Sequence, residues 1–440
     1  MLKKIVHPPK EKWPELAKRP VLDTGELESQ VRDIMTEVRD GGDRSLLYYR
    51  DLYDRAYGNG LEVPFEEMEK AGDELSFQLK DAINLAARNI EKFHKAQMPR
   101  DINVATMAGV TCSRKCLPLE KVGLYVPGGT APLFSTVLML AIPARIAGCR
   151  EITVCTPPGE NGKVHPAILH AAFISGVTSL YSVGGAHAVA AMTFGTETIP
   201  AVDKLFGPGN QYVTMAKQAA SMWGTAIDLP AGPSELAIIA DTGSNPDFVS
   251  ADILSQAEHG PDSQVILTAT TQEVLTPVFG SLKRQLQKLP RYNTIVKSLE
   301  NSIALVFEDY NTLMEFINLY APEHLIISTS NYRELQRNVK NAGTVFLGRF
   351  TPESTGDYSS GANHTLPTNG FAKGWSGVDL ESFMKRVTFQ EVSSSGLPLV
   401  GEAAETMALA EGLDGHALAV SVRLDHIKNS LQRPWEPSIH

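Results

Sequence analysis

The chain has 440 residues, of which 43% are hydrophobic and 20% are charged, as in an ordinary soluble globular protein of about three domains. Its 40 Lys and Arg against 50 Asp and Glu give a net charge of −10, which argues against nucleic acid or an anionic membrane surface as the main partner. Four cysteines make no disulfide framework, and neither a signal-peptide pattern nor a membrane-length apolar run is found, so we expect a cytoplasmic protein that does not enter a membrane.

The first hundred residues are predicted to be mainly helical. Apolar side chains recur at helix spacing over residues 75–93, and Pro99 ends the pattern. From about residue 122, short β-branched runs alternate with helical stretches. The first series predicts strands at 122–126, 152–155 and 179–183, and helices at 135–147, 165–174, 186–194 and 211–222.

A second alternating series follows. It predicts strands at 236–240, 265–269, 304–307, 325–328 and 344–347, with a helix at 246–259 and further helices between the strands. Residues 398–431 are predicted to be a helical tail. Strand and helix in alternation indicate parallel sheets covered on both faces, so we expect an α/β fold with two doubly wound modules.

Three glycine turns lie between a predicted strand and a predicted helix, at residues 127–130, 184–187 and 207–210. Glycine lets the backbone approach a ligand closely, and the amides of a helix start favour an anion such as pyrophosphate. The full dinucleotide fingerprint is absent, because Tyr212 stands where its third glycine belongs. Taken together, the turns leave a nucleotide site and plain loop geometry about equally supported.

The predicted helix at 246–259 ends in a candidate metal site. Asn245 suits its N-cap and Gly260 its end. Gln256 and His259 are three residues apart, so they share a face near the C-terminus, where the helix dipole favours a cation. Glutamine is an uncommon zinc ligand, and this pattern by itself favours a surface or capping pair.

Two further segments carry possible chemistry. Glu323 and His324 directly precede a predicted strand, and such a pair can move two different protons, although neighbours of these types are common by chance. Residues 351–370 are dense in Gly, Ser, Thr, Pro and Asn, and a long irregular segment of this kind is often functional. Asp357 and His364 lie in it and are potential ligands or orienting groups.

Six strings resemble the histidinol dehydrogenase family over about residues 20–430: VGLYVPGG at 122–129, FGPGN at 206–210, PAGPSE at 230–235, LSQAEHG at 254–260, PEHL at 322–325, and GDY at 356–358 followed by NH at 363–364. The resemblance implies oxidation of L-histidinol to L-histidine in two successive NAD-dependent steps, through L-histidinal that stays bound. These are the last steps of histidine biosynthesis. It also implies one zinc ion per subunit and a homodimer of intertwined subunits with a shared active site.

The resemblance implies roles for particular residues. Zinc would be bound by Gln256, His259 and Asp357 of one subunit and by His416 of the other. The acid–base pair would be Glu323 and His324, with His324 taking the hydroxyl proton and Glu323 activating water. Besides His324 and the zinc ligands, the substrate contacts would be Ser234, His364 and Glu411. The cofactor contacts would be Tyr125, His187 and Asn210.

A division into four parts follows from the same resemblance. An N-terminal arm would comprise residues 1–20, and a discontinuous zinc and substrate domain residues 21–122 and 235–378. A Rossmann-like NAD-binding domain would comprise residues 123–234. Residues 379–440 would form a helical tail that is swapped onto the partner subunit.

Two residues depart from the family pattern. His187 stands where the family usually has glutamine, and its cation would sit poorly beside oxidised nicotinamide. We therefore expect NAD affinity to fall as the pH drops through about 6 to 7. Gly415 precedes His416 where the family often has alanine, which loosens the register of the fourth zinc ligand.

Three alternatives to a histidinol-oxidising enzyme are considered. A related dehydrogenase could act on another small polar alcohol, such as a sulfonated diol, but Glu411 and His416 favour an imidazole substrate. A zinc hydrolase could use Glu323 to activate water without a hydride acceptor, and the glycine turns argue against it. A non-catalytic relative is disfavoured because every residue that the resemblance assigns to metal binding or proton transfer is present.

Overall fold

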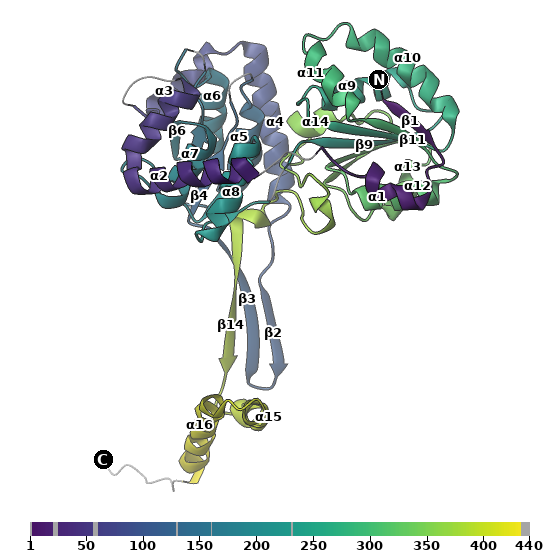
Figure 1. Ribbon diagram of the computed structural model, residues 1–440. Coiled ribbons are helices and arrows are strands. Elements are labelled where there is room, and N and C mark those ends of the chain that lie inside the picture. Colours follow the sequence, from purple (N-terminus) through teal and green to yellow (C-terminus); the bar gives the residue numbers. More distant parts are fainter. Residues whose placement is uncertain are drawn as a thin grey trace. The chain divides into compact units, whose positions relative to one another are not determined.

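The computed structural model describes residues 2–20, 25–55, 60–128, 131–159, 161–229 and 232–432. The chain forms two compact units (Figure 1). The first comprises Met1–Met98 and Leu119–Phe383, and the second comprises Pro99–Pro118 and Met384–His440. Each unit is described by itself below.

The first alternating series forms a parallel sheet in the first unit, with the strand order β6-β5-β4-β7-β8. Its strands are β4 (Lys121–Tyr125), β5 (Glu151–Thr156), β6 (Ser179–Ser182), β7 (Lys204–Phe206) and β8 (Ala226–Ile227). The helices that connect or follow them are α5 (Phe134–Ala147), α6 (Pro166–Ser175), α7 (Gly185–Phe194) and α8 (Gln211–Met222). Helices α5, α6 and α7 are apolar on nearly every face because they are buried between the sheet and further helices.

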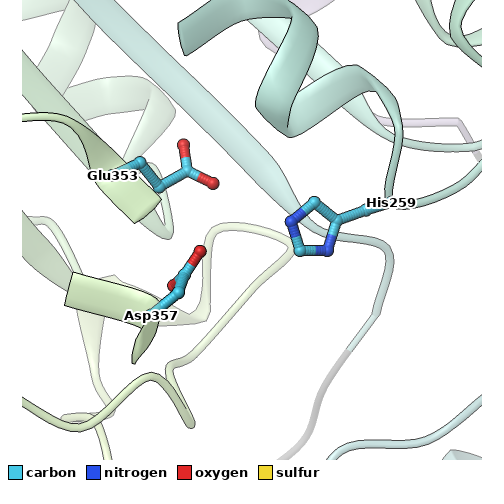
Figure 2. Close-up of side chains that lie close together, drawn as sticks. All are labelled: His259, Glu353 and Asp357. Carbon is cyan, nitrogen blue, oxygen red and sulfur yellow. The ribbon is translucent and has the colours of Figure 1, made fainter. Parts of the chain in front are cut away.

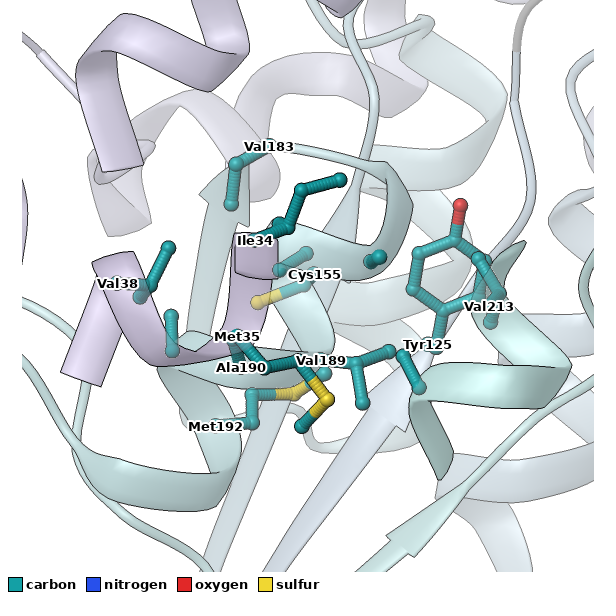
Figure 3. Close-up of a cluster of buried hydrophobic side chains, with 14 of the residues drawn as sticks. Ile34, Met35, Val38, Tyr125, Cys155, Val183, Val189, Ala190, Met192 and Val213 are labelled. Carbon is teal, nitrogen blue, oxygen red and sulfur yellow. The ribbon is translucent and has the colours of Figure 1, made fainter. Parts of the chain in front are cut away.

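The N-terminal helices pack on the helices that flank this sheet. They are α2 (Gly25–Tyr49), α3 (Phe65–Lys70) and α4 (Phe77–Lys95). Helix α2 contacts α7 and α8, α3 contacts α6, and α4 contacts α5. Figure 3 shows the core under α2, where Met35 and Val38 pack with Val189 and Met192 of α7. All four side chains are fully buried, so the apolar stripe of α2 is explained by this contact.

The second alternating series forms a six-stranded parallel sheet, with the order β1-β11-β10-β9-β12-β13. Its strands are β1 (Lys3–Val6), β9 (Glu235–Ala240), β10 (Gln264–Ala269), β11 (Ile303–Val306), β12 (His324–Ser328) and β13 (Thr344–Leu347). The longer helices are α9 (Pro246–Ala257), α10 (Leu275–Leu286), α11 (Tyr292–Glu300) and α12 (Tyr310–Tyr320), and the short ones are α1 (Trp13–Leu16), α13 (Tyr332–Leu335) and α14 (Glu353–Tyr358). Every residue of β9 is buried because apolar clusters cover both faces of the sheet.

The predicted fold class, with two parallel α/β sheets, is confirmed. Strand β1 was not expected, because its exposed Lys3 and Lys4 and its length of four residues carry no strand pattern, and only its pairing with β11 makes it the edge of the sheet. The predicted four-part division stays a prediction.

The second unit contains an antiparallel sheet of order β14-β3-β2 and a pair of helices. The strands are β2 (Ile102–Met107), β3 (Val110–Pro118) and β14 (Met384–Val392), and the helices are α15 (Leu397–Ala410) and α16 (Asp414–Gln432). The helices confirm the predicted helical tail, and its swap onto a partner stays a prediction. The strands were not expected, because most of their residues are exposed or half-buried and show little alternation. Across the described residues, no helix is both long enough and apolar enough to span a membrane.

Candidate functional site

The predicted acid–base pair lies at the amino ends of two neighbouring strands. Glu323 directly precedes β12, which His324 begins, and β12 pairs with β9. The carboxylate of Glu323 accepts a hydrogen bond from the backbone N–H of Glu235, the first residue of β9, at 3.0 Å. Helix α9 runs back across the sheet, so its C-terminal end brings Gln256 to the same edge.

His324 is surrounded by three carboxylates. Its Nδ1 lies 3.6 Å from Glu353 Oε1 and 3.9 Å from Glu323 Oε2, and its Nε2 lies 3.7 Å from Asp357 Oδ1. These separations are too long for hydrogen bonds, and neither ring nitrogen has another partner among the described residues. The imidazole is therefore buried with both nitrogens available to a ligand.

Burial dominates the protonation of this pair. Burial, together with the charges of His259 and His364, lowers the pKa of His324 to about 3. Burial raises the pKa of Glu323 well above its ordinary value, as do the charges of Glu235 and Asp357, although the hydrogen bond from the backbone of Glu235 opposes the shift. At neutral pH, His324 is thus an uncharged imidazole that can accept a proton.

A possible metal cluster adjoins His324. One ligand atom from each of His259, Glu353 and Asp357 lies within 4.8 Å of the other two (Figure 2). Burial raises the pKa of Asp357 to about 7, and it also raises the pKa of Glu353, whose shift is increased by the charges of Asp357 and Glu323. In Figure 2 the two carboxylates project from α14 toward the imidazole of His259.

The residues of this cluster fit a zinc ion. Zinc in proteins is bound by imidazole nitrogen and carboxylate oxygen, and a bound metal removes the cost of burying carboxylates together. Gln256 is fully buried one helical turn before His259, and its amide oxygen and nitrogen have no partner among the described residues. A buried side-chain amide without hydrogen-bond partners is costly unless a ligand binds it, and a metal ion bound to the amide oxygen of Gln256 would remove part of this cost.

His364 and Ser234 lie beside the same cluster. His364 donates from Nδ1 to the backbone carbonyl of Asp357 at 2.9 Å, so its Nε2 is the acceptor and receives the Thr136 hydroxyl at 3.2 Å. Burial lowers the pKa of His364 to about 4. The Ser234 side chain hydrogen-bonds Glu323. The structure therefore brings Ser234 to Glu323 and His364 to Asp357, and their roles as substrate contacts stay predictions.

The three predicted cofactor residues line one cavity of about 510 Å³, a volume typical of small-molecule sites. Tyr125 ends β4, His187 lies on α7, and Asn210 caps α8 by accepting two backbone N–H groups at 3.1 Å. Tyr53 and Tyr212 also line the cavity. Aromatic rings beside polar groups suit a nucleotide.

The glycine turns differ in what they do. The backbone N–H of Gly184 donates to Asp54 Oδ2 at 2.8 Å, and that of Gly185 donates to the Tyr125 hydroxyl at 3.1 Å, so these amides already have partners. Gly207 has a φ of 117°, and a Cβ there would overlap the carbonyl oxygen of Tyr125, so this turn requires glycine for packing. The remaining turn, at residues 127–130, falls partly outside the described residues, which omit 129–130.

Two acidic residues of these sites were missed in the sequence. Glu353 lies four residues before Asp357 on α14, inside the segment at 351–370, and this helical spacing was the available signal. Asp54 gave no local signal, because it reaches the cavity from a position 130 residues away from Gly184. Its Oδ2 also lies 3.3 Å from Nε2 of His187, which is buried.

Glu411 and His416 lie in the second unit. Glu411 is the C-cap of α15, and His416 is near the start of α16, where Gly415 is also helical. Both side chains are exposed. Their assignment to substrate and zinc stays a prediction.

Comparisons with known proteins place this geometry in a family. A family model described as histidinol dehydrogenase matches residues 17–424. The chain is 54% identical to histidinol dehydrogenase of Bacteroides thetaiotaomicron, over 97% of the chain and 100% of that protein, and 46% identical to that of Vibrio parahaemolyticus, over 94% and 95%. The crystal structure of histidinol dehydrogenase from Elizabethkingia anophelis superposes with a TM-score of 0.94 at 48% identity, covering 97% of this chain and 99% of that one. The chain belongs to the histidinol dehydrogenase family.

Proposed function

We propose that this protein oxidises L-histidinol to L-histidine in two successive NAD-dependent steps through bound L-histidinal, as the last steps of histidine biosynthesis in the cytoplasm. One observation carries the proposal beyond family membership: the imidazole of His324 is buried among three carboxylates with both ring nitrogens unpaired among the described residues. Such a group is arranged to receive a proton from a substrate in a site from which water is excluded.

His324 acts in the first oxidation. It takes the proton of the substrate hydroxyl, which frees the electron pair that forms the carbonyl as hydride leaves the carbinol carbon. NAD supplies the hydride acceptor when it is bound. Burial lowers the pKa of His324, so the ring starts uncharged and can take up the proton.

Glu323 acts in the second oxidation, which requires hydration of the aldehyde. Glu323 takes a proton from water as the water oxygen attacks the carbonyl carbon, and the carbonyl oxygen takes up the proton that His324 held from the first step. The resulting diol then returns a hydroxyl proton to His324 as its one carbon-bound hydrogen leaves as hydride to a second NAD. The backbone N–H of Glu235 and the side chain of Ser234 fix the carboxylate, and its raised pKa makes it a stronger base than an ordinary glutamate.

Zinc would be held, one ion per subunit, by Gln256, His259 and Asp357, with His416 of the partner subunit as the fourth ligand. When bound, the ion supplies a positive centre for the imidazole and amino nitrogens of the substrate. His364 and Glu411 would contact the same substrate, and the two hydrogen bonds of His364 fix its ring in place. Tyr125, His187 and Asn210 would contact NAD in the 510 Å³ cavity.

A homodimer that shares its active sites is supported by the second unit. Large apolar side chains of α15 and α16 are exposed there, at 64% for Met407, 60% for Leu418 and 54% for Leu409. Apolar groups gathered on two packed helices are typical of a surface that another protein covers. We propose that a second copy covers them.

Metal analysis combined with NADH stoichiometry tests this function on the purified protein, before and after chelation. We expect one zinc per chain, two NADH per histidinol, and loss of both after chelation, with recovery when zinc is restored. A sulfonated diol should yield no NADH. Hydrolysis without NADH formation, or faster turnover of the diol, would exclude the proposal in favour of one of the alternatives.

A further inference from the structure

We propose that Asp54 determines cofactor specificity: its carboxylate accepts hydrogen bonds from the adenosine ribose hydroxyls of NAD and repels the additional phosphate of NADP. The inference rests on the proposed function, because it takes the 510 Å³ cavity as the NAD site. Asp54 lies at the end of the turn that follows α2 and lines this cavity together with Tyr125, His187 and Asn210.

The carboxylate of Asp54 is held rigidly. Its side chain is 8% exposed, its Oδ2 accepts the N–H of Gly184 at 2.8 Å, and the same oxygen lies 3.3 Å from His187 Nε2. These contacts employ Oδ2, and among the described residues no hydrogen bond reaches Oδ1. A carboxylate offers about four acceptor positions on its two oxygens, so Oδ1 remains available to a pair of neighbouring hydroxyls.

The charges of the cavity point to the same selectivity. Among the described residues that line it, Asp54 is the one acid, and none is lysine or arginine. A 2′-phosphate would therefore meet the carboxylate of Asp54 without a lysine or arginine among the described lining residues to pair with it. In dinucleotide-binding folds an acidic residue commonly binds the ribose 2′-hydroxyl of NAD, whereas arginine accommodates the phosphate of NADP.

Asp54 also changes what the N-terminus of α7 can do. Its carboxylate occupies the backbone N–H of Gly184, where the sequence alone suggested a pyrophosphate cradle. The side chain therefore places a negative charge near a helix start that would otherwise attract phosphate. The same contact locates the anion of the cofactor elsewhere in the cavity and leaves this end to neutral hydroxyl groups.

The test is calorimetric titration of NAD and of NADP into the zinc-loaded, full-length protein, without substrate. We expect the wild type to bind NADP at least about tenfold more weakly than NAD, since an unpaired charge at a ligand phosphate costs this much or more. Asp54→Asn keeps an oxygen that can accept the N–H of Gly184 but removes the charge. The Asp54→Asn variant should bind NAD about tenfold more weakly than the wild type, and its dissociation constants for NAD and NADP should be close to each other.

Asp51→Asn is the matched control. Asp51 lies in the same turn, pairs with Arg50 at 3.4 Å and does not line the cavity. Its replacement should therefore leave the ratio of the NADP and NAD dissociation constants unchanged. Asp54→Glu keeps the charge and should keep the preference for NAD, and Asp54→Ser gives a second neutral variant should Asp54→Asn fail to fold.

Each result separates the inference from the proposed function. Folded, neutral Asp54 variants could keep the wild-type ratio of NAD and NADP affinities, or lose affinity for both nucleotides to the same extent. Either result would mean that Asp54 only caps α7. Equal binding of NAD and NADP by the wild type would also overturn the inference while leaving histidinol oxidation intact. Failure of the wild type to bind either nucleotide would refute the cavity as the cofactor site, and the inference with it.

Discussion

A buried ion pair beside the candidate site provides the sharpest test of the structure. Arg19 makes two hydrogen bonds to Glu235, at 2.6 and 2.7 Å, and its guanidinium lies 3.8 Å from the centre of the Tyr320 ring. The side chains of Arg19 and Glu235 are 10% and 1% exposed. The perturbation is Arg19→Met, which keeps an apolar stem beside Tyr320 and removes the charge.

The expected cost follows from the burial of Glu235. Removing one partner of a buried ion pair leaves an uncompensated charge and typically costs about 3–5 kcal/mol of stability. We expect about 3 kcal/mol, the lower end, because burial already raises the pKa of Glu235 and the orphaned carboxyl group can take up a proton instead. Arg19→Met combined with Glu235→Gln should recover most of this loss, because neither charge remains.

Guanidinium unfolding of the zinc-free protein, followed by circular dichroism, measures these differences without a contribution from metal binding. Lys10→Met is the control, because Lys10 forms an ion pair with Glu315 in which both side chains are more than half exposed, and its loss should cost no more than about 1 kcal/mol. If Arg19→Met cost no more than Lys10→Met, or if the double variant were no more stable than the single one, the assigned burial of this pair would be wrong.

Three further predictions follow from the site and its surroundings. Glu323→Gln should retain the first oxidation and lose the second, so that NADH per histidinol falls from two toward one; two NADH at the normal rate would remove Glu323 from water activation. His416→Asn should lower the bound zinc well below one per chain, and unchanged zinc with full turnover would exclude His416 as a ligand. Burial raises the pKa of Cys149 to about 12, so at pH 8 the folded protein should react with a thiol reagent at this residue about a thousandfold more slowly than the unfolded chain does, and equal rates in peptide mass spectrometry would contradict its burial.

The sequence by itself determined most strands of the two parallel sheets and the local position of several candidate site residues. The alternation of β-branched runs with helical stretches predicts strands such as 152–155 and 325–328, because a strand buried on both faces must be apolar along its whole length. These agree with β5 and β12. Helical spacing predicts Gln256 and His259 near the C-terminal end of a helix; Gln256 lies there in α9, and His259 lies two residues beyond its end. Glu323 and His324 are predicted directly before a strand, and His324 is the first residue of β12. These are local properties, which the order of residues determines directly.

Tertiary structure alone decided which distant groups meet. Glu353 is placed against His324, and Asp54 against Gly184 and His187, by the packing of elements that lie far apart in the chain. Strand β1 becomes part of a sheet because β11 supplies its hydrogen bonds, and β14 pairs with β3 across more than 250 residues of chain (Met384 opposite Pro118). A carboxylate has the same sequence signature on a solvated surface as in a buried site, since its neighbours in space, and not those in sequence, determine its charge and its partners.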